Sequence, residues 1–223
     1  MGNIIEEIEQ DLKDDKKVLF SGTPCQVAAV TSCIKDKYKD NLYTCDLVCH
    51  GVPSEAIFRD FLKYVEEKEN KHIKEFNFRD KEFGWDTHFE TSIFDDGTKK
   101  TTYYFRNLFM RLNILRPSCY KCNYASIHRT ADVTIADFWG VDEVLPEMYD
   151  KTGVSLTLIN TEKGKELFNE IKENLIYKEC EISNAIKRNP NLSNPSSMPD
   201  TREEFWRDYF SKNFEYIIDK YSK

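Results

Sequence analysis

Four of the seven cysteines stand in three short segments rich in turn residues, at positions 23–26, 49–53 and 116–122. A turn residue beside a cysteine leaves the thiolate at an irregular backbone position, outside any helix or strand ladder. The last segment holds a Cys-x-x-Cys pair. We therefore predict a four-thiolate site assembled from distant parts of the chain, with Cys25, Cys49, Cys119 and Cys122 as ligands. Such a site is typical of an iron–sulfur cluster or a structural zinc ion.

The first two cysteine segments share one local pattern, in which an apolar strand runs into a cysteine turn and then into a helix. A strand over residues 18–20 precedes Cys25 and a helix over 26–34 follows it. The second strand covers residues 42–48 and precedes Cys49, and Ser54 caps a helix that runs to about residue 68. Two such units in tandem predict a small parallel βαβ core, with both cysteines at the same edge of the sheet.

The rest of the chain predicts a mixture of strands and helices. Alternating apolar and polar residues indicate further strands at 73–79, 87–94, 99–105, 133–136 and 154–159. Asp95-Asp96-Gly97 indicates a hairpin turn. Helices are expected at 3–15, 106–114 and 162–173, an irregular linker at 187–199, and an aromatic-rich helix pair at 200–221.

We expect an α/β (α+β) fold with a mixed sheet, a βαβ core, an antiparallel hairpin section and a C-terminal helical extension. The domain is expected to span residues 1–180, and residues 181–223 form a linker and a helical extension. Phe205, Trp206, Tyr209 and Phe210 of this extension are expected to pack back on the domain.

Charge and hydropathy exclude several classes of partner. The net charge of the 223 residues is −7 and the basic residues are dispersed, which argues against nucleic acid. No apolar run reaches the roughly 20 residues of a membrane span. No secretory signal is visible at the N-terminus, so we expect a cytoplasmic protein with reduced thiols. In that compartment, cysteine clusters favour metal or redox chemistry over disulfides.

Spacing alone leaves several alternatives open. The four cysteines fit an iron–sulfur cluster, a zinc site in a non-enzymatic scaffold or partner-binding domain, or buried thiols. Cys119 and Cys122 alone would fit a thiol oxidoreductase. Cys33, Cys45 and Cys180 are expected to be small buried hydrophobic residues, and Cys45 is the substitute ligand if one of the four is wrong.

A set of motifs in a fixed order then identifies a family. The motifs occupy residues 20–28 (FSGTPCQVA), 46–54 (DLVCHGVPS), 78–81 (FRDK), 84–85 (GW), 115–122 (LRPSCYKC), 132–140 (DVTIADFWG) and 153–156 (GVSL). In these motifs the chain resembles the C-terminal domain of the coenzyme F-420 hydrogenase/dehydrogenase beta-subunit family. The resemblance spans about residues 15–175. Relatives usually carry an upstream segment, and it is expected to be absent here because the resemblance begins almost at Met1.

The resemblance implies part of a flavin and iron–sulfur oxidoreductase. In the family, FAD exchanges a hydride and a nearby 4Fe–4S cluster carries single electrons. The expected hydride carrier is a deazaflavin, reduced nicotinamide or a similar compound. The expected electron partner is a ferredoxin or a ferredoxin-like domain or subunit. A homo-oligomer is compatible with the sequence.

Further residues become candidates for the cofactor site through this resemblance. His50 is expected to relay a proton or to bond the cofactors, and a turn histidine bonded to backbone is the alternative. Thr23, Pro24, Gln26 and Gly51 are expected to let a phosphate or flavin approach helix N-termini, against plain turn chemistry.

The remaining candidates are charged and aromatic. Arg79 and Arg129 are expected to bind the FAD pyrophosphate or an acidic hydride carrier, with exposed ion pairs as the alternative. Asp137 and Trp139 are expected to form a wall beside the cofactors, and aromatic packing in the core is the alternative.

Overall fold

The computed structural model describes residues 2–223, which form two compact units. Among the described residues, unit 1 comprises 2–50, Cys122–Asp150 and Val154–Pro195, and unit 2 comprises Gly51–Lys121, Lys151–Gly153 and Ser196–Lys223. Each unit is built from separate stretches of the sequence, and the domain division expected at residue 180 stays a prediction. Among residues 2–223, no helix has both the length and the apolar character that a membrane span requires.

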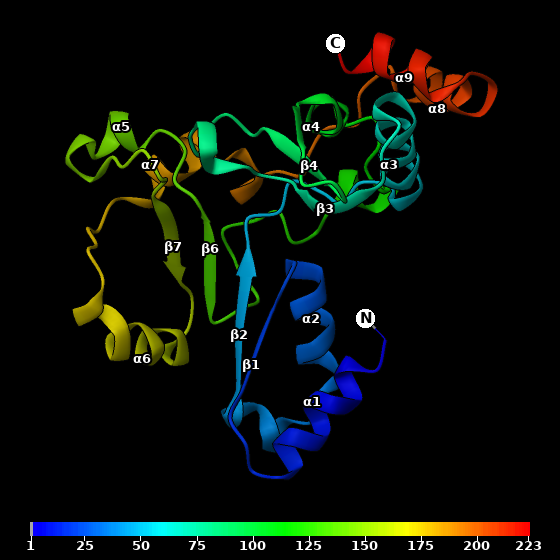
Figure 1. The fold of residues 1–223 in the computed structure, drawn as a ribbon. Helices are drawn as coiled ribbons and strands as arrows, with labels where there is room; N and C mark the ends of the chain where they lie inside the picture. The colour runs from blue at the N-terminus through cyan, green and yellow to red at the C-terminus, as the bar shows by residue number, and fades with distance from the viewer. Residues whose placement is uncertain (1) are drawn as a thin grey trace. The chain divides into compact units, whose positions relative to one another are not determined.

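Unit 1 contains a four-stranded mixed sheet (Figure 1). In spatial order its strands are β1 (Val18–Gly22), β2 (Leu42–Leu47), β6 (Val133–Asp137) and β7 (Ser155–Ile159). The β1–β2 and β2–β6 pairs are parallel, whereas β6 and β7 are antiparallel. The predicted parallel core is therefore confirmed, and the carboxyl ends of β1, β2 and β6 meet at one edge of the sheet.

Helices surround this sheet in unit 1. They are α1 (Ile4–Lys13), α2 (Pro24–Cys33), α5 (Val141–Val144), α6 (Glu162–Ile171) and α7 (Ile182–Arg188). Ile8 and Leu12 of α1 are one helical turn apart, and they pack with Val30 and Leu42 in a buried apolar cluster. Figure 1 shows α1 and α2 beside β1 and β2. A second cluster includes Phe138, Leu156 and Leu192.

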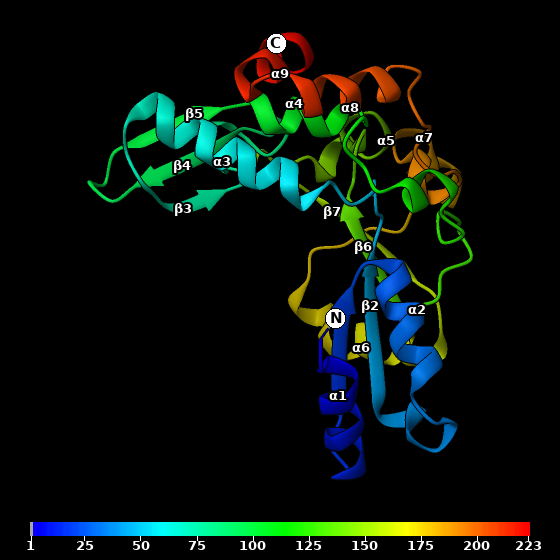
Figure 2. The ribbon, with the colours of Figure 1, turned by 90° about the vertical axis from the view of Figure 1, so that its right-hand side faces the viewer.

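Unit 2 contains a three-stranded antiparallel sheet and four helices (Figure 2). The strands are β3 (Ile73–Asn77), β4 (Glu90–Phe94) and β5 (Lys99–Thr102). The helices are α3 (Glu55–Glu69), α4 (Tyr104–Met110), α8 (Arg202–Ser211) and α9 (Phe214–Tyr221). The hairpin expected at residues 95–97 is confirmed, because Gly97 adopts φ +79° between β4 and β5.

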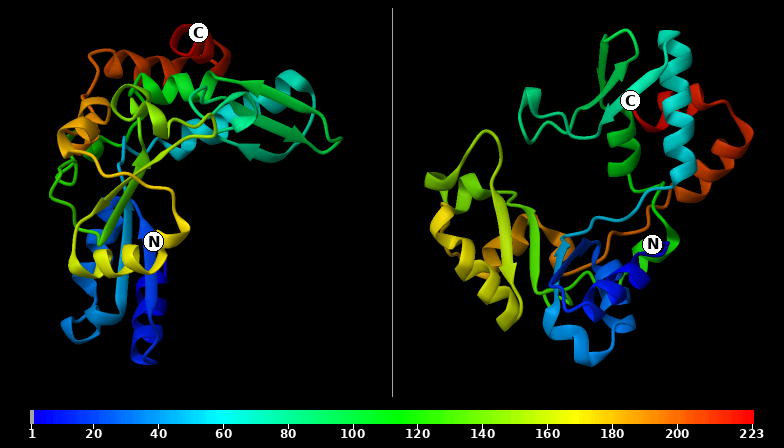
Figure 3. Two further views of the ribbon diagram at one scale, coloured as in Figure 1. Left: turned by 90° about the vertical axis from the view of Figure 1, so that its left-hand side faces the viewer. Right: turned by 60° about the horizontal axis from the view of Figure 1, so that its bottom comes forward.

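The core of unit 2 joins the C-terminal helices to α3. Ile57, Phe61 and Val65 recur every fourth residue of α3 and are buried in one apolar cluster with Phe205 and Ile217. Figure 3 shows α3 near the C-terminal helices from two further directions. The expected packing of the helix pair is confirmed, with one correction. Phe210 is 79% exposed, so it does not belong to this core.

The chain turns from β5 into α4 earlier than the residue pattern indicates. The expected strand over 99–105 ends at Thr102, and α4 begins at Tyr104. The buried Glu90 carboxylate explains this, because it accepts hydrogen bonds from the N–H groups of Phe105 (2.7 Å) and Arg106 (2.8 Å). These are donors of the first helical turn that have no partner within the helix.

We expect Glu90→Gln to lower the free energy of unfolding by about 2 kcal/mol, because the amide turns an NH₂ group toward a backbone N–H. Burial raises the pKa of the Glu90 carboxyl, although its hydrogen bonds oppose the shift. As the pH rises from the ordinary glutamate value through the folded pKa, the unfolded state binds fewer protons than the folded state, and stability falls. The variant has no carboxyl at this position, so its stability should not follow this titration. Urea denaturation across this pH range should therefore show the difference in the free energy of unfolding between wild type and variant becoming smaller as the pH rises. A constant gap would contradict the assignment.

Candidate functional site

Three predicted site segments follow the carboxyl ends of adjacent parallel strands in unit 1. Cys25 comes after β1, Cys49 and His50 come after β2, and residues 137–139 close β6. The prediction that Cys25 and Cys49 share one edge of the sheet is confirmed by this topology. In open parallel sheets, ligands commonly bind at this edge.

Cys25 is the second residue of α2, and its side chain is exposed. The Thr23 hydroxyl oxygen lies 3.2 Å from Cys25 Sγ. Gln26 Oε1 accepts hydrogen bonds from the Thr23 N–H (2.9 Å) and the Thr23 hydroxyl (3.0 Å), and Pro24 is buried. Cys25 therefore lies in the first turn of a helix, where backbone N–H groups have no partner within the helix. Gln26 has a local role in the helix start, and its contact with a cofactor stays a prediction.

Cys49 lies two residues beyond the end of β2. His50 Nδ1 is 3.1 Å from Asn191 Oδ1. The Asn191 amide nitrogen donates to the carbonyl of Asn194 (3.2 Å), so its oxygen faces the imidazole. The ring proton is therefore on Nδ1, and Nε2 is the basic nitrogen of the neutral ring. This tautomer suits the predicted proton relay, which stays a prediction.

In unit 2, the loop that follows Cys49 in the sequence pairs with the segment before Cys119. Ser54 N–H donates to Ile114 O (2.8 Å), and Arg116 N–H donates to Val52 O (2.9 Å). In addition, the Val52 N–H donates to Cys119 Sγ (3.4 Å). Hydrogen bonds to cysteine sulfurs are among the features that tune iron–sulfur clusters.

Gly51 begins this loop with φ +133°. Residues with side chains rarely adopt this φ, and a Cβ atom at Gly51 would lie 2.6 Å from Cδ1 of the buried Leu115, so a substitution would strain the backbone and displace Leu115. Its requirement for glycine has a structural cause, and its approach to a phosphate or flavin stays a prediction.

The Cys-x-x-Cys pair lies at the boundary between the two units along the chain. Cys119 belongs to the short 3₁₀ helix Pro117–Lys121 of unit 2, and Cys122 is the first residue of the next stretch of unit 1. The intervening Tyr120 is buried, and Arg202 Nη1 donates to its hydroxyl (2.9 Å). Both cysteines are half-buried.

The other three cysteines differ from the four predicted ligands. Burial raises the pKa of the half-buried Cys45 thiol and Asp46 adds to this, so the thiolate is disfavoured at the substitute ligand. Burial also raises the pKa of the Cys180 thiol, with a contribution from Glu181. The expectation that Cys33 is buried is wrong. Cys33 ends α2 and is exposed.

Two candidate segments have local hydrogen bonds. In unit 2, Arg79 Nη2 donates to Trp85 O (3.0 Å). In unit 1, Asp137 ends β6 opposite Ser155, and the N–H of the buried Phe138 donates to Val154 O (2.9 Å). Trp139 is half-buried. The roles of Arg79, Asp137 and Trp139 at a cofactor stay predictions.

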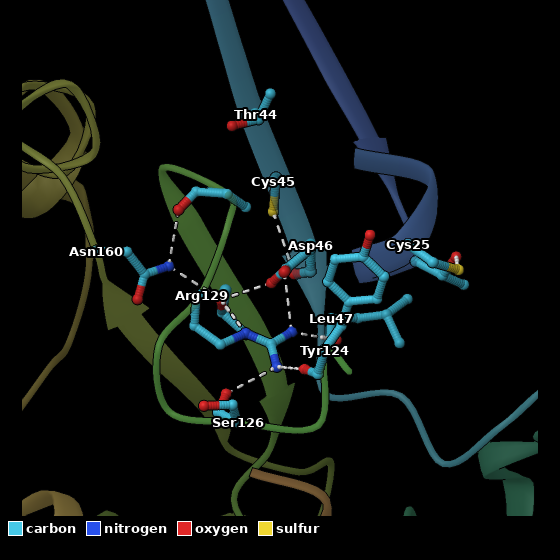
Figure 4. Close-up of polar contacts among 12 residues, drawn as sticks. Cys25, Thr44, Cys45, Asp46, Leu47, Tyr124, Ser126, Arg129 and Asn160 are labelled. Atoms are coloured by element: carbon cyan, nitrogen blue, oxygen red, sulfur yellow. Dashed lines mark hydrogen bonds and ion pairs between the residues drawn. The ribbon is translucent and has the colours of Figure 1, made fainter. Parts of the chain in front are cut away.

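Arg129 forms a buried network in unit 1 (Figure 4). Its Nη2 contacts Asp46 Oδ2 at 2.9 Å, and the side chains are only 1% and 0% exposed, respectively. The expected alternative of an exposed ion pair is therefore wrong. Thr134 Oγ1 donates to Asp46 Oδ1 (2.5 Å) and accepts from Asn160 Nδ2 (3.0 Å). The binding of a cofactor pyrophosphate by Arg129 stays a prediction.

Sequence reasoning missed the partners of Arg129, although a signal was present. Polar residues occupy every second position of two apolar strands, at Thr44 and Asp46 and again at Asp132 and Thr134. In strands, alternate residues share one face. Charged residues on such a face need buried partners, so this pattern indicates a polar network between the strands.

No group of three or more His, Cys, Asp or Glu side chains close enough to hold a metal ion occurs among residues 2–223. Of the predicted ligands, Cys25, Cys49 and Cys122 belong to unit 1 and Cys119 to unit 2. The four-thiolate site stays a prediction.

Comparison with known proteins gives a family. The family model for the C terminus of the coenzyme F420 hydrogenase/dehydrogenase beta subunit matches residues 15–185. A xenon-derivatised F420-reducing NiFe hydrogenase complex from Methanosarcina barkeri contains a similar chain, with 15% identity and a TM-score of 0.48. That match covers 83% of this chain and 64% of the hydrogenase chain. No match to a curated protein sequence was found. The family match covers most of the sequence, and the chain therefore belongs to the coenzyme F420 hydrogenase/dehydrogenase beta-subunit family, through its C-terminal region.

Proposed function

We propose that this protein is an electron-transfer oxidoreductase module that binds FAD and a 4Fe–4S cluster. The family consists of oxidoreductase subunits. One structural observation carries the proposal. Cys25 and Cys49 follow the carboxyl ends of neighbouring parallel strands, and the loop directly after Cys49 donates a backbone N–H to the sulfur of Cys119.

Cys25, Cys49, Cys119 and Cys122 would hold the cluster. Their chemistry fits this role, because thiolates are the ligands that iron–sulfur clusters prefer. The loop after Cys49 directs one N–H at sulfur, since the Val52 N–H donates to Cys119 Sγ. Cys25 lies at the start of α2, and its side chain is exposed.

The flavin contacts are proposed from the family resemblance. They are Thr23, Pro24, Gln26, Gly51, Arg79, Asp137 and Trp139. When bound, FAD would supply the conversion between hydride transfer and single-electron transfer. His50 would accept or return a proton at Nε2, since Asn191 holds the other ring proton on Nδ1. The partners would be a deazaflavin or similar hydride carrier and a ferredoxin or ferredoxin-like subunit.

The first experiment is an absorption spectrum of protein purified without oxygen, with iron, sulfide, zinc and flavin assayed on the same sample. We expect a broad visible band that bleaches with dithionite, and about four irons per chain, as one cubane cluster contains. Flavin in the same sample would show that this chain holds both cofactors. Zinc without iron after attempted reconstitution would overturn the proposal in favour of a scaffold.

A further inference from the structure

The Arg129 guanidinium has five N–H donors, and the structure gives each one an acceptor within unit 1. Nε donates to Thr134 Oγ1 (3.2 Å). Nη1 donates to the carbonyls of Tyr124 (3.0 Å) and Ser126 (3.3 Å). Nη2 donates to Asp46 Oδ2 (2.9 Å) and to the Leu47 carbonyl (3.0 Å). Figure 4 shows the guanidinium between Asp46 and the Tyr124 and Ser126 carbonyls.

Three of these acceptors are backbone carbonyls close in sequence to predicted ligands. Tyr124 and Ser126 stand two and four residues after Cys122, and Leu47 stands two residues before Cys49. The segment between Cys122 and β6 has no helix or strand of its own. Arg129 therefore supplies hydrogen bonds that would otherwise have to come from a regular element or from water.

A buried ion pair does not by itself explain this arrangement. Desolvation of two charges offsets most of their attraction, and well-packed apolar residues often stabilise such a site equally well. A planar guanidinium, unlike an ammonium, can bind several fixed acceptors at once. The bonds from one side chain to both cysteine-bearing segments indicate a positional role.

We propose that Arg129, neutralised by Asp46, is the positioning residue that holds the backbone of the Cys122 loop against the end of β2 that leads to Cys49. This inference rests on the proposed function, in which both cysteines are ligands. Hydrogen bonds to the backbone next to ligands orient the ligands and tune their affinity for metal. Arg129 thereby acts on the site through the backbone, without contact between its side chain and the metal.

The test compares Arg129→Met with the double variant Asp46→Leu/Arg129→Met. The single variant leaves a buried carboxylate without its cation and should melt at a markedly lower temperature than wild type. The double variant removes both charges and should recover most of that loss. It does not recover the carbonyl contacts at residues 124 and 126. Arg129→Lys keeps the charge without the planar fork, and Arg188→Lys in the exposed pair with Glu143 is the matched control.

Two measurements on these variants separate a positional from a purely structural role. Hydrogen exchange of amides 123–128 in metal-free protein should be about tenfold faster in the double and Arg129→Lys variants, while β2 stays protected. Iron loss to a chelator from the reconstituted protein should be about tenfold faster in the same variants. Arg188→Lys should match wild type in both.

The outcomes decide the inference even if the proposed function fails. The double variant is expected to regain most of the wild-type melting temperature. If its amides 123–128 also exchange at the wild-type rate and it retains iron as wild type does, the positioning role of Arg129 is overturned. If wild-type protein takes up no iron, the proposed function fails and the exchange data alone decide whether Arg129 orders this loop. If the double variant does not fold, Arg129→Lys decides, and wild-type values in that variant would count against the proposal.

Discussion

Replacement of Cys119 by serine is expected to abolish the iron–sulfur cluster and to lower the melting temperature of the anaerobically purified protein. A serine hydroxyl is a hard, weakly acidic ligand that replaces a soft thiolate. The substitution also removes the sulfur acceptor of the Val52 N–H. Iron should fall from about four per chain to near zero, because cysteine thiolates hold a cubane cluster and one of the four proposed ligands is removed. The visible band should disappear with it.

Cys33→Ser is the matched control for this experiment. Cys33 is exposed at the end of α2 and has no predicted ligand role. Its variant should keep the iron, the visible band and the melting temperature of wild type. In Cys119→Ser, by contrast, the folded state no longer gains stability from a bound cluster. This loss should lower the apparent free energy of unfolding by about 3–4 kcal/mol. Unchanged absorbance and melting in Cys119→Ser would remove Cys119 from the ligand set.

Gly164→Ala is expected to destabilise the protein by about 3 kcal/mol, which is large for the addition of one methyl group. Alanine favours a helix over glycine by about 1 kcal/mol, so propensity alone predicts the opposite sign. Packing decides the outcome, because a Cβ atom at Gly164 would lie 2.2 Å from the backbone oxygen of Asp132. Helix α6 would have to move away from the start of β6.

Asp132 cannot retreat easily from this contact. Its carboxylate accepts bonds from the Thr44 N–H (2.8 Å) and the Thr161 hydroxyl (2.6 Å), and its carbonyl accepts from the Asn160 N–H (2.9 Å). A thermal melt should therefore show a loss of about 10 °C for a chain of this size.

The control for Gly164→Ala is Glu166→Ala in the same helix, at an exposed position. It should melt within about 2 °C of wild type, because exposed helical substitutions change stability by less than about 0.5 kcal/mol. If the two variants melt at the same temperature, α6 and Asp132 are less tightly packed than the structure shows.

Local sequence patterns were sufficient for much of the fold. The strand–cysteine–helix units at Cys25 and Cys49, the hairpin at residues 95–97 and the amphipathic faces of α1 and α3 are readable because each depends on residues near in sequence. Strand and helix ends were less accurate where a distant side chain decides them. The start of α4 depends on Glu90, which lies on a strand fourteen residues before Tyr104 and accepts the N–H bonds of the first turn.

The sequence by itself determined the α/β class, the family and the cysteines that carry the proposed chemistry. Motifs and hydrophobic periodicity depend only on which residues follow one another along the chain. Only the tertiary structure decided what Arg129 contacts. The sequence predicted that Arg129 binds a cofactor or forms an exposed ion pair. In the structure its side chain is buried and donates to five acceptors, some of them more than 80 residues away in the sequence. Hydrogen-bond partners of a side chain depend on which distant strands pair, and the β2–β6 register brings Asp46 opposite Thr134. No local pattern contains that register.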